Sequence, residues 1–339
     1  MIKTAVIGFG LSAKVFHLPF LTAQAGYQLV ALSSSQSDAQ NFKSGLTVYP
    51  EAQQLISQTD AQLVVITSPN QSHYLLAKAA LLAGKHLVVE KPFTLRQYEA
   101  EELADLAAQK NLQLCAFHNR RFDDDFLALQ QQIQQGCLGQ VRLMQSRYDR
   151  FRPEVQQRWR ETADFGSGIL FDLGPHLIDQ ALLLFGEPEA LTARCRVLRD
   201  SGKNTDYFQL QLHYADKEVC LSSSPFAAAV PLRFEVQGSL ATFRSYGLDP
   251  QEEILRFGQG RTDPRWAVRQ QQRQAELSDA GGTRPLPLGK GHYSCFYQQL
   301  ALALHGQAPL PVTVQEALHS VKAIELALQS ADTGKTLNW

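Results

Sequence analysis

Three side chains supply the groups that proton transfer beside a developing charge would need. Lys91 follows the apolar stretch 86–89 in the run Glu90-Lys91-Pro92, and a lysine there can hold a substrate hydroxyl and favour its ionisation. Asp172 and His176 are four residues apart, so they share one face if this segment is a helix. A histidine exchanges protons near neutral pH, and a nearby carboxylate orients it. The pair also fits a capping aspartate beside a buried histidine.

A glycine-rich turn near the N-terminus is typical of a dinucleotide site. The stretch 8–13 (GFGLSA) lies between an apolar strand predicted at 2–7 and a helical stretch near 12–25. Gly8 permits the tight turn, Gly10 lets the backbone approach a pyrophosphate, and Ala13 allows the helix to pack closely on the strand. The positive end of the helix favours the phosphates. We expect cofactor contacts along this turn at Gly8, Gly10, Leu11, Ser12 and Ala13.

The end of the second predicted strand bears on the choice between NAD and NADP. NAD enzymes normally place an acidic residue there to bind the ribose 2′-hydroxyl. Here the stretch is Ser33-Ser34-Ser35-Gln36, with no acid before Asp38. Hydroxyls and backbone N–H groups suit a 2′-phosphate, so NADP is favoured over NAD, although the usual arginine is missing and Lys43 is the nearest cation in the sequence. A serine-rich turn that accepts either cofactor is the alternative.

The elements that must position these residues form two groups. Strands are predicted at 2–7, 28–33, 62–67, 86–89 and 113–117, with helices near 12–25, 72–82 and 95–110. Near-continuous apolar strands separated by helices indicate an α/β Rossmann domain, a doubly wound parallel sheet. Ser68-Pro69-Asn70 follows one strand, where it fits either a ligand contact or a simple turn and helix cap.

The rest of the chain has a different rhythm. Helices are predicted at 126–135, 169–185, 293–304 and 314–331, and strands at 141–148, 191–199, 206–215, 217–224, 231–237 and 240–246. Strands joined by short turns indicate an α+β domain with a large open, mostly antiparallel sheet. The Gln-, Gly- and Pro-rich stretch 258–290 is expected to be a loop. We predict two domains, 1–120 and 121–339.

Bulk properties exclude several classes of partner. The 339 residues carry a net charge of −1 and no basic stripe or long apolar run, which argues against nucleic acid and membrane. The chain enters a strand directly after Met1, so we expect a cytoplasmic protein without a signal peptide. Its five scattered cysteines form no metal-binding pair. Asp123-Asp124-Asp125 precedes a helix, whose dipole explains the acids better than a metal would.

Five motifs occur together in a known order: GFGLSA, SPNQSH, EKPF, FHNRRFD and DLGPHLID. In this order and spacing the chain resembles the glucose–fructose oxidoreductase / inositol dehydrogenase (Gfo/Idh/MocA) family over nearly its whole length. The segments FHLPF, HNRRFDDDF, DRFRPEV and DYF are similar to those of NADP-dependent scyllo-inositol dehydrogenases and their near relatives. Close relatives can carry Asp where this chain has Glu90.

The resemblance implies roles for particular residues. Lys91 matches the catalytic lysine, and Asp172 and His176 match a catalytic pair in which His176 transfers the proton. Besides the glycine turn, expected cofactor contacts are Ser33, Ser34, Ser35, Ser68, Pro69, Asn70, His73, Glu90, Lys91 and Asn119. Expected substrate contacts are Lys91, Arg120, Tyr148, Arg152, Trp159, Asp172 and His176. His17 is a further candidate for a contact with cofactor or substrate, and a packed surface histidine is the equal alternative. No metal is expected.

The activity implied is reversible hydride transfer between nicotinamide and a hydroxyl of a small polyol or sugar, such as scyllo-inositol. The resemblance also implies a homodimer or homotetramer assembled through the second sheet. Another sugar dehydrogenase is the runner-up. A non-catalytic NAD(P)-sensing regulator and a redox-assisted glycosidase are the alternatives of other classes.

Overall fold

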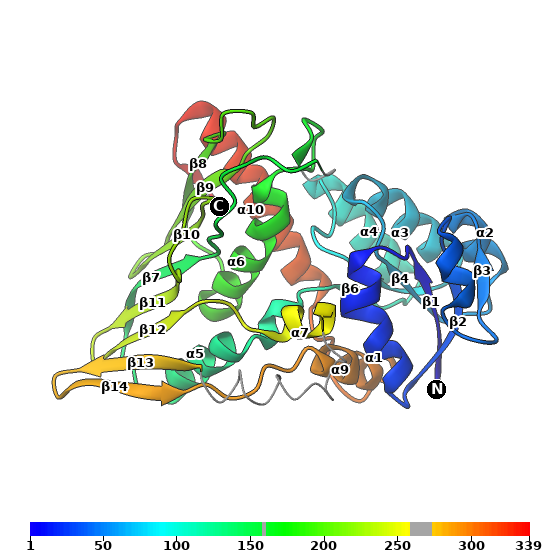
Figure 1. Cartoon of the computed structure of the whole chain (residues 1–339), viewed down its shortest axis with the longest axis horizontal. Helices are drawn as coiled ribbons and strands as arrows, with labels where there is room; N and C mark the ends of the chain where they lie inside the picture. The colour runs from blue at the N-terminus through cyan, green and yellow to red at the C-terminus, as the bar shows by residue number, and fades with distance from the viewer. Residues whose placement is uncertain (158–160, 258–272) are drawn as a thin grey trace. The chain divides into compact units, whose positions relative to one another are not determined.

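The computed structural model describes residues 1–157, 161–257 and 273–339 (Figure 1). Contacts between Cα atoms divide these residues into two compact units, and the first break in the chain falls between Asn119 and Arg120. The segments 252–257 and 292–321 cluster with the first unit, whereas 322–339 cluster with the second. The predicted division into 1–120 and 121–339 does not anticipate this return of the chain.

The first unit contains a six-stranded parallel sheet in the order β3-β2-β1-β4-β5-β6. Its central strands are apolar and almost wholly buried, as a sheet covered on both faces requires. The strand order reverses between β1 and β4, and ligands of such sheets bind at this reversal, beyond the carboxyl ends of the strands. The predicted Rossmann fold is therefore confirmed. The strands are β1 (Ile2–Ile7), β2 (Tyr27–Ser33), β3 (Thr47–Tyr49), β4 (Leu63–Ile66), β5 (His86–Val89) and β6 (Leu114–Ala116).

Helices of the first unit pack on this sheet and on one another. Helix α3 contacts β4, β5 and α4, while α1 contacts β2 and helix α9, which comes much later in the chain. A π-helical segment, η1 (Ala13–His17), lies within the helix that follows the glycine turn. The helices are α1 (Leu18–Ala23), α2 (Ala52–Gln58), α3 (His73–Leu82), α4 (Gln97–Gln109), α7 (Gln251–Phe257) and α9 (Ser294–Leu304), with α10 (Val314–Thr333) continuing from this unit into the second.

The second unit contains a nine-stranded sheet in the order β14-β13-β12-β11-β7-β10-β9-β8-β15. Among the described residues, every strand pairing in this sheet is antiparallel except that of β7 with β10, which confirms the predicted mostly antiparallel sheet. Helix α6 (Ile169–Phe185) packs on β9 and β10, and α5 (Asp124–Gln134) begins directly after Asp123. The strands are β7 (Val141–Arg147), β8 (Ala190–Arg196), β9 (Tyr207–His213), β10 (Glu218–Ser223), β11 (Leu232–Gly238), β12 (Thr242–Tyr246), β13 (Gln274–Asp279), β14 (Gly282–Pro287) and β15 (Leu337–Asn338).

The stretch 258–290 was expected to be a loop, and for its described part this is wrong. Residues 274–287 form the hairpin β13–β14, and 258–272 lie outside the described residues. Pro285 and Pro287 hid the second strand, because proline removes a backbone donor and is accepted mainly on edge strands. β14 is an edge strand of the sheet and is largely exposed. No helix in the described ranges is long and apolar enough to cross a membrane.

Candidate active site

The two motif glycines are needed for different reasons. Gly8 has φ of +101°, and a Cβ there would lie 2.6 Å from Thr67 Oγ1, so the protein's own backbone requires glycine. Gly10 is different, because a Cβ at this position would meet no described atom within 4 Å. The open space over Gly10 is what a dinucleotide lying against the backbone would need. The glycine turn therefore fits the cofactor that its sequence predicts.

A lysine that the sequence analysis did not identify lies near the end of β2. Lys14 Nζ is 2.8 Å from Asp38 Oδ2 and 3.3 Å from Gln36 Oε1, beside the Ser34–Ser35 turn. Ser34 is fixed locally, since its N–H donates to Tyr49 O and its hydroxyl accepts from Gln36 N–H. Sequence distance had pointed to Lys43. Lys14 reaches the turn because it lies on the helix that runs from the glycine motif past the end of β2.

The ends of β4 and β5 are tied together by His73. This histidine is fully buried, with Nδ1 2.8 Å from Pro92 O and Nε2 3.0 Å from Ser68 O. Burial is the main cause that lowers the pKa of His73. Asn70 is also buried, in the turn Asn70–Ser72 after Pro69, and the Lys91–Pro92 peptide is cis. His73 thus fixes both loops, and its predicted contact with the cofactor stays a prediction.

Glu90 is enclosed at the start of the lysine motif. Its carboxylate lies against the Ser12 hydroxyl and the His17 ring, with His17 Nε2 3.0 Å from Glu90 Oε1. Lys91 N–H donates to Glu90 Oε2 over 2.9 Å. Burial alone would raise the pKa of Glu90, but the hydrogen bond and charge of His17, with Lys91 and Ser12, lower it to about 2. Glu90 is therefore a buried carboxylate that belongs to the protein's own hydrogen-bond network.

In the second unit, α6 positions the predicted acid–base pair. The helix begins after Gly168, which has φ of +85°, and it places Asp172 in its first turn with His176 one turn later. Asp172 Oδ2 lies 3.8 Å from a terminal nitrogen of Arg150, and both side chains are partly exposed. His176 is buried. The two residues share a helix face, so the carboxylate can orient a histidine that exchanges protons.

Buried polar contacts anchor α6 beyond His176. Arg121 forms a two-point ion pair with Asp179, with Nε to Oδ2 at 2.8 Å and a terminal nitrogen to Oδ1 at 2.5 Å. Gln180 donates to the backbone oxygen of Arg120 and accepts from Arg233. Such charge-assisted, bidentate bonds define geometry as well as energy. They hold the helix that carries Asp172 and His176.

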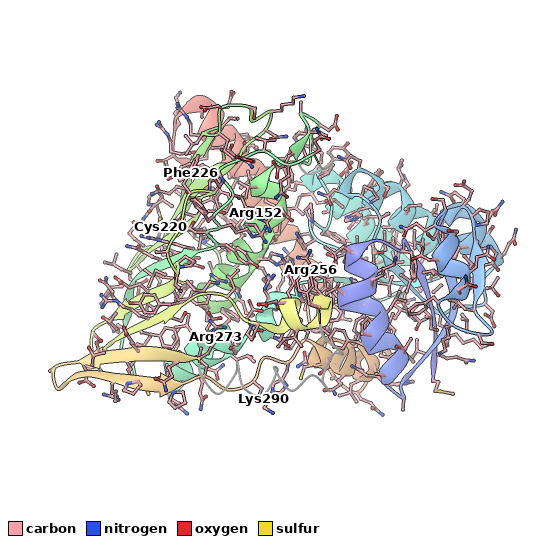
Figure 2. The ribbon with its side chains drawn as sticks, in the orientation of Figure 1. Arg152, Cys220, Phe226, Arg256, Arg273 and Lys290 are labelled. Carbon is pink, nitrogen blue, oxygen red and sulfur yellow. The ribbon has the colours of Figure 1, made fainter. Side chains whose placement is uncertain are left out.

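Several predicted substrate residues gather beside the start of α6. The ring of Tyr148 is flanked by the guanidinium groups of Arg120, at 4.9 Å from the centroid, and Arg150, at 5.1 Å. Arg152, labelled in Figure 2, follows β7 in the chain. It lines a small cavity of about 40 Å³ together with Arg150 and Asp172. Trp159 lies outside the described residues. The second unit thus brings Arg120, Tyr148, Arg152 and Asp172 into one neighbourhood.

The remaining predicted residues belong to the first unit. Lys91 follows β5, and Asn119 is buried just before the break between the units. Lys91 belongs to the first unit and His176 to the second, and their meeting at the substrate stays a prediction.

The acidic residues at the start of α5 bind an arginine side chain, an interaction that the helix dipole alone did not predict. Asp124 and Asp125 are buried and pair with Arg273 at 2.5 and 3.3 Å, at the base of the β13–β14 hairpin (Figure 2). Asp123 makes no capping hydrogen bond with its side chain. Burial and the neighbouring carboxylates raise the pKa of Asp124 to about 9. No group of three or more acidic, histidine or cysteine side chains within the described ranges could hold a metal ion.

Comparison with known proteins agrees with this architecture over the whole chain. The family model described as "Oxidoreductase family, NAD-binding Rossmann fold" matches residues 2–118, and its companion "Oxidoreductase family, C-terminal alpha/beta domain" matches 130–338. Uncharacterized oxidoreductase YdgJ of Escherichia coli is 40% identical over 99% of this chain and 98% of its own. The scyllo-inositol 2-dehydrogenase (NADP(+)) IolW of Bacillus subtilis is 35% identical over 99% of this chain and 95% of its own.

Solved structures agree as well. The putative oxidoreductase yvaA of Bacillus subtilis superposes with a TM-score of 0.94 at 34% identity, covering 100% of this chain and 98% of that one. Both halves of the fold and both halves of the sequence thus match one family. The chain belongs to the Gfo/Idh/MocA family of NAD(P)-dependent oxidoreductases.

Proposed function

We propose that the protein transfers hydride between a nicotinamide cofactor and a hydroxyl-bearing carbon of a cyclitol or sugar, with a scyllo-inositol-like polyol as substrate. The observation that carries this proposal is the placement of Asp172 and His176 on one face of an anchored helix, beside the Arg120–Tyr148–Arg152 neighbourhood. The relative named scyllo-inositol 2-dehydrogenase supports the choice of polyol. The runner-up substrate is another sugar.

In the proposed mechanism the protein moves one proton and stabilises one charge. His176 takes the proton of the reacting hydroxyl in oxidation and returns it in reduction, while Asp172 keeps the ring oriented and favours its charged form. The Lys91 ammonium stabilises the negative charge that develops on the substrate oxygen. The bound nicotinamide supplies the hydride chemistry. Arg152 and Tyr148 contribute contacts to the other hydroxyls.

Replacement of His176 tests this mechanism. We expect His176→Ala to lower kcat by roughly 10²–10⁴, the usual contribution of a general acid–base, while the Kd for the dinucleotide stays nearly unchanged. Absorbance at 340 nm with scyllo-inosose and NADPH or NADH measures turnover. His292→Ala, which removes an exposed histidine, is the control and should keep wild-type rates. A fully active His176→Ala protein would refute the mechanism. Tight dinucleotide binding without turnover on any polyol would favour the regulatory alternative.

We also propose a preference for NADP. The Ser34–Ser35 turn offers no carboxylate to the ribose, and Lys14 lies beside it. The Lys14–Asp38 pair is 39% and 62% exposed, so it contributes little stability and leaves Lys14 available to a 2′-phosphate. We expect Lys14→Gln to weaken NADPH binding far more than NADH binding.

Adding a carboxylate at the same turn provides the reciprocal test. We expect Ser34→Asp to repel the 2′-phosphate and shift the preference toward NADH, measured as the ratio of kcat/KM for the two cofactors. Lys43→Gln is the matched control, because it removes a lysine that is near the turn in sequence, whereas the lysine bonded to Gln36 and Asp38 is Lys14. An unchanged ratio in both Lys14→Gln and Ser34→Asp would count against this assignment. The expected assembly through the antiparallel sheet stays a prediction.

A further inference from the structure

A chain of buried polar groups links the glycine turn to the lysine motif within the first unit. The Ser12 hydroxyl and His17 Nε2 both reach Glu90 Oε1, and Lys91 N–H reaches Glu90 Oε2. His17 is fully buried and Glu90 nearly so. Both carboxylate oxygens of Glu90 are therefore occupied by groups of the protein itself.

The far end of this network comes from the C-terminal part of the chain. Tyr297 Oη, on α9, lies 2.6 Å from His17 Nδ1 and is 280 residues away in sequence. Burial raises the pKa of Tyr297 well above its ordinary value, so the phenol keeps its proton and hydrogen-bonds His17 through Nδ1. Because a carboxylate can only accept, His17 Nε2 carries a proton and donates it to Glu90. The π-helical turn Ala13–His17 contains His17 at its end, and such turns often mark functional sites.

This geometry gives Glu90 a different task from direct contact with a ligand. Its carboxylate holds Ser12, at the start of the cofactor helix, and the backbone of Lys91 at one point. A shift of the carboxylate would therefore move the dinucleotide turn and the lysine together. Displacements of about 1 Å in a reacting group can cost about 10²-fold in rate.

We propose that Glu90 is a positioning residue. Its carboxylate, held by His17 and through it by Tyr297, fixes the position of the glycine turn relative to Lys91. The part that concerns catalysis rests on the proposed function of Lys91, whereas the part that concerns the cofactor turn rests on dinucleotide binding alone.

Two tyrosines provide a matched test. Tyr297→Phe removes the hydroxyl that hydrogen-bonds His17 Nδ1. Tyr27→Phe removes another buried hydroxyl, which donates to the backbone oxygen of Tyr297 over 2.6 Å and does not contact His17 in the described part of the chain. We expect both variants to lose thermal stability to a similar extent. Only Tyr297→Phe should also weaken dinucleotide binding and lower kcat, each by about tenfold, the worth of one hydrogen bond to a charged network. KM for the polyol should change less than twofold in both.

Glu90→Gln extends the test with a side chain of the same size. Its amide cannot accept from Ser12, His17 and Lys91 at once, so we expect a larger loss of dinucleotide affinity than in Tyr297→Phe. The dinucleotide Kd, measured by nicotinamide fluorescence, requires no turnover, so it judges the network even if no polyol is oxidised and the proposed function fails. Equal Kd values for Tyr297→Phe, Tyr27→Phe and the wild type, or a Glu90→Gln protein with wild-type Kd and kcat, would overturn the proposal.

Discussion

The buried pair Arg121–Asp179 allows a stability prediction with a defined magnitude. Both side chains are at least nine-tenths buried, and two bonds of 2.8 and 2.5 Å join them. Asp179→Asn leaves the Arg121 guanidinium buried without its countercharge. Breaking a buried pair in this way costs about 3–5 kcal/mol, which lowers the folding equilibrium constant by about 10²–10³·⁵.

Unfolding in guanidinium chloride measures this loss of folding free energy, with an exposed ion pair as the control. Asp60→Asn breaks the Lys3–Asp60 pair, whose side chains are 45% and 66% exposed, and should change the unfolding midpoint very little because water already screens that pair. Fluorescence and circular dichroism are recorded together, since a two-unit chain need not unfold in one step.

A double replacement separates burial from loss of charge. Arg121→Met with Asp179→Leu removes both charges and fills similar volume, so it should recover most of the stability lost in Asp179→Asn. The reasoning is refuted if Asp179→Asn shifts the midpoint no more than Asp60→Asn does.

Two further predictions concern the glycine turn and the acidic run. Gly8→Ala should destabilise the fold, because of its positive φ and its contact with Thr67, whereas Gly10→Ala should leave the melting temperature unchanged and weaken dinucleotide binding; equal effects on both quantities would contradict this. The folded protein raises the pKa of Asp124 to about 9, so its protonation stabilises the fold at low pH and this contribution disappears as pH rises through 9. The melting temperature should thus fall between pH 6 and 9.5, and less so in Asp124→Asn; an equal fall in that variant would be evidence against a shifted Asp124.

The sequence predicted best those helices and strands whose own residues define where they begin and end. The strand 86–89 and the helix 169–185 begin and end where expected. The strand is a short apolar stretch that stops at Glu90, and the helix is rich in apolar residues and lies between Gly168 and Gly186. The strand Thr47–Tyr49 and the helix Ala52–Gln58 were missed, since both are short and partly exposed. Such elements are stabilised by neighbours that a local pattern does not contain.

For the candidate site, too, the sequence predicted what local motifs define and not what depends on contacts between distant segments. Glycine, lysine and helix motifs predicted which segments carry the chemistry, because the spacing of these residue types is local. The supports of those segments were not predictable: Lys14 reaches the β2 turn through space, and Tyr297 meets His17 only after the chain has folded back. For His17 the sequence left a ligand contact and a packed surface histidine open. The surface alternative is wrong, because His17 is fully buried between Glu90 and Tyr297, and the ligand contact stays a prediction.

The return of α9 to the first unit sets an order on biosynthesis. Phe117, at the end of the Rossmann sheet, packs edge-on against Phe296 at 4.7 Å, and Tyr27 donates to the backbone of Tyr297. The ribosome adds Phe296 and Tyr297 only after most of the second unit has been synthesised. A nascent chain that has passed residue 120 therefore carries an incomplete dinucleotide unit, in which Phe117 lacks its contact with Phe296 and His17 lacks its bond to Tyr297. That unit completes its core after the whole antiparallel sheet except its last strand, β15, has been synthesised, so a fragment ending at residue 120 would lack part of its own interior.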